Sequence, residues 1–227
     1  MGFSREPTMT AKNPGFFGRN GLTIVVLACM LLALVGQIVS GHLVYNDELE
    51  EMGGEALTLG QYLLSGHFVS ATFENWESEF LQMGMYVLLT VSLRQKGSAE
   101  SRPLDPAQEQ ERVEKGDAPW PVRRGGIWKS LYGHSLAIAF TVLFVASFLL
   151  HLDGSWRHDV VERQLKGDQP LRLMDYLASP DFWFESFQNW QSEFLAVGSL
   201  VVLTIWLRQK DSPQSKPLQA PHSQTGT

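Results

Sequence analysis

Residues 73–81 read FENWESEFL, and residues 187–195 read FQNWQSEFL. Of the 26 positions in 73–98, 16 carry the same residue as the position 114 further along the chain. The match continues without a gap through Leu93-Arg-Gln-Lys and Leu207-Arg-Gln-Lys. Chance does not produce this degree of identity, so we interpret the chain as an internal duplication.

Four apolar runs decide the fold class. Residues 22–39 and 136–152 are long enough for helices that cross a ~30 Å hydrocarbon core at ~1.5 Å per residue. The runs 80–93 and 194–207 are shorter, so their helices must also contain part of the polar block before them. We predict an all-α membrane protein in which four transmembrane helices form two tandem helical hairpins, a parallel internal repeat.

Composition excludes several other classes. The 227 residues contain a single cysteine, Cys29, so an internal disulfide scaffold is excluded. The net charge of −6 gives no reason to expect nucleic acid as a partner. A mean hydropathy of −0.08 averages apolar runs with highly charged connections, which is not typical of a soluble globule.

The distribution of Lys and Arg predicts the orientation. The segment 40–72 contains none of the 18 basic residues, whereas 94–129 contains eight. By the positive-inside rule, both termini and the central connection are cytoplasmic. The predicted regions are a cytoplasmic N-terminal tail (1–20), a first repeat (21–96) with outer segment 40–72, a cytoplasmic linker (97–133), a second repeat (134–210) with outer segment 153–186, and a disordered C-terminal tail (211–227).

Helix-end signals refine two of these boundaries. Ser179-Pro180-Asp181 supplies an N-cap, a first-turn proline and a favourable carboxylate, so the fourth helix is predicted from Pro180 to Arg208. A cleaved signal peptide is the alternative for the first run, because Val39-Ser40-Gly41 is typical of a cleavage site. The counterpart of this run at 136–152 favours a retained helix instead.

The block N-W-x-S-E-F…L-R-Q-K, present twice, and the ending Pro-Leu-Gln-Ala-Pro-His-Ser-Gln-Thr-Gly carry a family resemblance. The chain resembles an uncharacterised family of bacterial integral membrane proteins, known as a domain of unknown function. This resemblance implies a multi-pass protein of the bacterial cytoplasmic membrane. It implies no activity, cofactor or catalytic residue.

The candidate site consists of the acidic residues that both halves retain next to the apolar runs, Glu79 and Glu193. Ionisable groups at membrane depth are costly and often functional, so we consider an ion or proton site. Counting along the helices predicts contacts of Gln37 with Glu79 and of His151 with Glu193. The polar neighbours on the same helix faces are Asn75, Asn189, Ser78 and Ser192.

A structural role for this block ranks above an ion site. Trp76 and Trp190 are predicted interfacial anchors, and Asn and Ser side chains can link helices. No metal-binding or catalytic motif is present, so we expect no cofactor, no metal and no enzyme activity.

Three functions follow in order. The first is a structural or accessory membrane protein, with the lipid bilayer, a second copy of the chain or another membrane protein as partners. The alternative is a proton or cation conduit that uses membrane-embedded glutamates. An outer-face membrane enzyme is a distant third.

Overall fold

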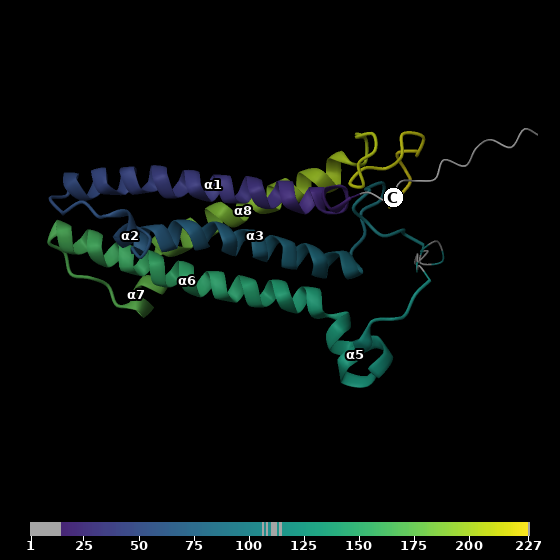
Figure 1. The fold of residues 1–227 in the computed structure, drawn as a ribbon, viewed down its shortest axis with the longest axis horizontal. Coiled ribbons are helices and arrows are strands. Elements are labelled where there is room, and N and C mark those ends of the chain that lie inside the picture. Colours follow the sequence, from purple (N-terminus) through teal and green to yellow (C-terminus); the bar gives the residue numbers. More distant parts are fainter. Residues whose placement is uncertain (1–14, 106, 108, 110–112, 114, 227) are drawn as a thin grey trace, which may run out of the picture. The chain divides into compact units, whose positions relative to one another are not determined.

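The fold is known from a computed structural model that describes residues 15–105, 107, 109, 113 and 115–226. Every regular element of these residues is a helix, which confirms the predicted all-α class. The chain divides into two units, Met1–Gly60 and Gln61–Thr227, and we describe each by itself (Figure 1). Residues 1–14 of the predicted N-terminal tail (1–20) lie outside the described residues, and residues 16–20 belong to the first helix rather than to a tail.

The first unit contains the long helix α1 (Phe16–Glu51), which includes the first predicted apolar run. Gly53, with φ +78°, ends it, and Gly54 N–H bonds the Leu49 carbonyl at 2.7 Å. This pattern is a Schellman C-cap, which requires a left-handed residue that glycine supplies without strain. Beyond it, Asn46 holds the Leu57 peptide on both sides, accepting from its N–H at 2.8 Å and donating to its C=O at 3.0 Å.

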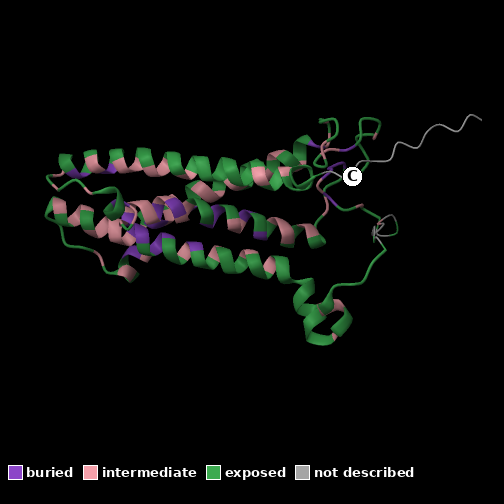
Figure 2. Cartoon of the chain, in the orientation of Figure 1, coloured by how far each residue is buried: buried purple, intermediate pink, exposed green. Residues whose placement is uncertain are grey.

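The second unit contains the long helices α3 (Gly66–Ser92), α6 (Ser135–Lys166) and α8 (Pro180–Leu203). α3 packs along α6 and also contacts α8, while the short α7 (Leu173–Leu177) packs on α6 and α8. The short helix α2 (Leu59–Tyr62) stands at the boundary between the two units. Buried residues gather on α3 and on the part of α6 that faces it (Figure 2).

Two glycines set the distance between α3 and α6. A Cβ on Gly66 would lie 2.5 Å from the Gly154 carbonyl oxygen, and one on Gly154 would lie 2.5 Å from Ser70 N. Small residues let helix backbones approach this closely. The contact therefore fixes which side chains of α3 and α6 can meet further along the pair.

Two helices, α1 and α6, are long and apolar enough to cross a membrane. They contain the first and third predicted runs. α8 begins at Pro180 as predicted, with Ser179 accepting from Phe182 N–H, but it ends at Leu203 rather than Arg208. The chain leaves the helix here in turns, and the Arg208 guanidinium caps the end by donating to the Thr204 carbonyl at 3.1 Å.

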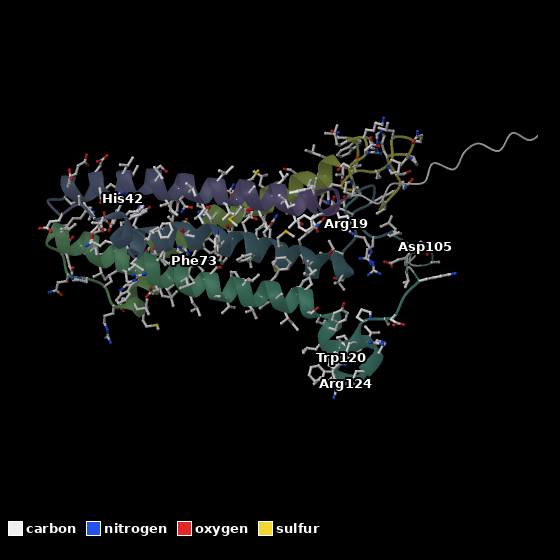
Figure 3. All side chains as sticks on the ribbon, viewed as in Figure 1. Arg19, His42, Phe73, Asp105, Trp120 and Arg124 are labelled. Carbon is white, nitrogen blue, oxygen red and sulfur yellow. The ribbon has the colours of Figure 1, made fainter. Side chains whose placement is uncertain are left out.

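Part of the predicted linker is helical. α4 (Trp120–Arg124) and α5 (Gly126–Gly133) precede α6. The Arg124 guanidinium lies 5.3 Å from the ring centres of both Trp120 and Trp128 (Figure 3). A cation between two aromatic faces stabilises this compact pair of turns, which the proline and glycine content of the segment did not indicate.

The segment after Asp211, expected to be disordered, makes defined contacts instead. Gly226 N–H bonds the Ser98 carbonyl at 2.9 Å, and Gly97 N–H bonds Thr225 Oγ1 at 2.9 Å. Both hydrogen bonds join positions more than 100 residues apart, so composition alone could not predict them.

Lys216 anchors this segment. Its side chain is 1% exposed, and its ammonium donates to the carbonyls of Gly97, His222 (3.1 Å) and Gln224 (2.9 Å). Burial lowers the pKa of the Lys216 ammonium, and the surrounding carbonyl dipoles are the groups that stabilise its charge. The C-terminal segment is thus attached to the loop that follows α3.

Candidate functional site

The predicted residues of α3 divide between its surface and its interior. Glu79, Asn75 and Trp76 are exposed, and Asn75 donates to the carbonyl of Ala71 in its own helix at 2.8 Å. Ser78 is buried and donates to the Asn75 carbonyl at 2.8 Å. These bonds stay within one helix and bring no second element to Glu79.

On α8, Ser192 donates to the Asn189 carbonyl at 2.8 Å, as Ser78 does on α3. Glu193 is partly buried, and the charge of Glu79 acts on it, so these two carboxylates are electrostatic neighbours. Gln37 lies on α1 in the other unit, and its contact with Glu79 stays a prediction.

His151 is the predicted residue that the structure places at the centre of a polar cluster. It is fully buried on α6, and its Nδ1 lies 2.8 Å from Oε2 of Glu77, which is also fully buried. Its Nε2 lies 3.6 Å from Oε2 of Glu185, too far for a hydrogen bond. The predicted contact of His151 with Glu193 is therefore wrong.

The His151–Glu193 contact was predicted wrongly because α8 ends earlier than the sequence indicated. His151 lies 16 residues from the start of α6, while Glu77 and Glu185 lie 15 and 18 residues from the ends of α3 and α8. Glu193 is only 10 residues from the observed end of α8. Counting from Arg208, as the sequence suggested, placed Glu193 at the depth that Glu185 occupies.

Glu77 is held on both oxygens. His151 bonds Oε2, and the indole N–H of Trp190 donates to Oε1 at 2.9 Å. Trp190 was predicted as an interfacial anchor, and in the structure its indole N–H binds the buried carboxylate of Glu77. Burying a carboxylate is costly unless it is paired and hydrogen-bonded, and both conditions hold for Glu77.

Glu185 and Glu74 complete the cluster. Ser155 donates to Glu185 Oε2 at 2.8 Å and lies 2.5 Å from the Tyr176 hydroxyl. The amide of Asn189 donates to Glu74 Oε1. Each of Glu74, His151 and Glu185 offers a ligand atom, and these three atoms lie within 4.8 Å of one another.

Aromatic side chains enclose the cluster on the side of α7 and α8. Phe182 is fully buried, with its ring centre 5.0 Å from that of His151 and 6.0 Å from that of Tyr176. The Glu185 side chain is 40% exposed, so the cluster is closed on the His151 side and reaches the surface at Glu185.

The main ionisable residues of this cluster other than His151 were missed because we searched for residues that both halves keep. Glu74 and Glu77 correspond to Gln188 and Gln191, and Glu185 corresponds to Ala71. The sequence signal that could have found them is a carboxylate in one half at a position where the other half has a neutral residue.

Fold and site together define an α-helical protein with a buried acid–histidine cluster between three helices. The chain belongs to the family described as Domain of unknown function (DUF6766), which matches residues 13–227. This match confirms the prediction of a family without an assigned function. No curated protein and no solved structure matches the chain.

Proposed function

We propose that this chain is a multi-pass protein of the bacterial cytoplasmic membrane that crosses the bilayer four times and binds a cation, at least a proton, at the cluster of Glu74, Glu77, His151 and Glu185. The observation that carries this proposal is the fully buried His151–Glu77 pair with two further carboxylates beside it. Such groups inside an apolar bundle are costly to keep, which favours a functional role over a purely structural one.

Exposed apolar side chains support the two additional spans. α3 exposes Met85, Leu88 and Val91 on the run that follows its polar block, and α8 exposes Leu195 and Val202. Large contiguous apolar surfaces are unusual on soluble monomers and are expected where lipid covers them.

Equivalent hydrogen bonds 114 positions apart support the tandem duplication. Ser65 accepts from the N–H three residues later at the start of α3, as Ser179 does in α8. Gly167 ends α6 with φ +78°, the value found at Gly53 after α1. A duplicated hairpin explains why helix starts and ends recur at a constant spacing.

Cation binding takes precedence over the accessory role that ranked first from the sequence, because the cluster is a specific observation in its favour. The accessory role and the outer-face enzyme stay predictions. Below the cluster, the buried Gln82 and the Tyr86 hydroxyl, which donates to Glu100 Oε2 at 2.9 Å, are polar groups that a conduit could use.

Tryptophan fluorescence tests the cation site, because Trp190 touches Glu77. In the detergent-purified full-length protein, we expect a pH-dependent change in emission that His151→Gln abolishes and His134→Gln, at an exposed position, leaves intact. Identical titration curves for the wild type and His151→Gln would overturn the proposal.

Cysteine labelling tests the four spans. In a Cys29→Ser background, an impermeant maleimide applied to spheroplasts should label Glu55→Cys and Asp168→Cys but not Asp117→Cys or Lys210→Cys. Labelling of all four, or of the second pair alone, would refute the topology.

A further inference from the structure

We infer that Glu74, His151 and Glu185 form a binding site for a divalent first-row transition-metal ion, with Glu77 as the residue that orients the histidine. This inference rests on the proposed cation site and specifies its ligand. Imidazole nitrogen with carboxylate oxygens is a donor set that suits ions such as Zn²⁺.

The free nitrogen of His151 carries the argument. Nδ1 lies 2.8 Å from the Glu77 carboxylate, which requires a proton on Nδ1. Nε2 is buried without a hydrogen-bond partner, and a metal ion bound there takes the place of the second proton that an imidazolium carries. A buried, unpartnered ring nitrogen that lies 3.6 Å from the Glu185 carboxylate, with a Glu74 ligand atom within 4.8 Å, is the arrangement that a metal ion would satisfy.

The distances fit a metal site after small side-chain adjustments. Bonds of about 2.0–2.2 Å place two ligands of a tetrahedral ion about 3.4 Å apart. His151 Nε2 and Glu185 Oε2 are already 3.6 Å apart, and the Glu74 ligand atom lies within 4.8 Å of both. Rotation of the Glu74 side chain, which is anchored by Asn189 rather than by a cation, would close the remaining distance.

Glu77 has the position of an orienting group behind a metal-bound histidine. Metal-ligating histidines commonly donate their other N–H to a carboxylate, which fixes the tautomer and the ring orientation. Trp190 holds that carboxylate in turn at 2.9 Å. The partial exposure of Glu185 provides a route by which an ion could enter.

Charge balance favours a divalent ion over a proton alone. The cluster contains the carboxylates of Glu74, Glu77 and Glu185, and His151 is the basic side chain that both Glu77 and Glu185 face. A bound divalent cation would compensate the excess negative charge, which is expensive in a low-dielectric bundle.

Calorimetric titration with Zn²⁺ tests the inference on the full-length protein, purified in detergent and treated with a chelator. We expect one Zn²⁺ per chain, with Glu185→Gln and His151→Gln each weakening binding by about 100-fold or more and Glu77→Gln by about 10–100-fold. The matched control is Glu79→Gln, which removes the same charge from an exposed position two residues from Glu77 and should leave binding unchanged.

Cobalt absorption at saturating Co²⁺ gives a second readout, which reports the ligands around the ion. Co²⁺ bound to the wild type should show visible d–d bands that change on Glu185→Gln. Helical content should stay native in this variant, because the Glu185 side chain is partly exposed.

Two results would overturn the metal site. One is the lack of saturable Zn²⁺ binding, and the other is an equal loss in Glu79→Gln and Glu185→Gln, which would indicate nonspecific attraction. If Zn²⁺ does not bind but the His151-dependent fluorescence titration persists, the cluster holds a proton, so the metal inference fails while the proposed function stands. Loss of both signals rejects both.

Discussion

His151 Nδ1 lies 2.8 Å from Glu77 Oε2, and neither side chain is exposed to solvent. The two residues are 74 positions apart in sequence and come from α6 and α3. This bond therefore joins the two helices that pack most extensively on each other among the described elements, within the buried acid–histidine cluster. Its integrity should affect both the stability of the fold and the binding properties of the site.

Glu77→Gln should destabilise the protein markedly. The change leaves His151 and Trp190 facing a neutral amide, and breaking a buried pair by removing one partner typically costs about 3 kcal/mol or more. Thermal unfolding in detergent, followed by circular dichroism, should show a midpoint about 5 °C or more below the wild type. Glu79→Gln, at an exposed position, should shift it by less than about 2 °C, and equal shifts would contradict the assignment.

Gly154→Ala should separate α3 from α6. The added methyl group would lie 2.5 Å from Ser70 N and 3.0 Å from the Gly66 carbonyl, and overpacking of this kind costs about 1–3 kcal/mol. The matched control is Gly198→Ala on α8, where a Cβ meets nothing within 4 Å. This control should be neutral or stabilising by up to about 1 kcal/mol, because alanine favours helix. A stabilised Gly154→Ala variant would show that the helices do not approach so closely.

Lys216→Met should release the C-terminal segment. Methionine keeps the aliphatic length but donates no hydrogen bond to the carbonyls of Gly97, His222 and Gln224. Limited proteolysis should then cleave after residue 211 at least about 5-fold faster, since local opening governs cleavage. Lys210→Met, at an exposed position, is the control and should match the wild type. Equal cleavage of both variants would show that the ammonium does not hold the segment.

Asn46→Ala should loosen the turn after α1. The substitution removes the acceptor of the Leu57 N–H, at a cost of about 1–3 kcal/mol for a donor left unsatisfied, whereas the Leu57 C=O keeps its contact with His42 Nε2 at 2.6 Å. Hydrogen exchange at the Leu57 amide should accelerate at least 5-fold. Asp47→Ala changes the exposed neighbouring residue and should leave that rate unaltered.

Helix positions followed from the sequence because their signals are local. Ser179 and Pro180 mark the start of α8, and the apolar run of α1 is continuous in sequence. The cluster depends on non-local facts: how closely Gly66 and Gly154 approach, and where α8 ends. Neither can be read from periodicity, so the sequence pointed to His151 but not to Glu77 and Glu185, the carboxylates that the structure places beside it.

The cluster is built from residues that differ between the two halves, whereas the family block is built from residues that are identical in them. Identical residues 114 positions apart are the basis of the proposed repeat, but Glu77 and Glu185 differ from their counterparts Gln191 and Ala71. A comparison of the two halves treats equivalent positions alike, whereas the buried cluster takes different residues from each half. Glu79 and Glu193, the carboxylates that both halves keep, are not among the residues of the cluster.

The cluster draws its residues from both halves of the chain, which has a consequence under the proposed duplication. Glu74 and Glu77 come from one side of the central linker, and His151 and Glu185 come from the other. If the ancestor was a single hairpin that paired with itself, each copy has since lost chemical groups that the other retains. A half-length chain would then lack part of the cluster. Residues 1–105 and residues 106–227, each expressed alone, should lack cation binding. Expression of the two fragments together should restore it.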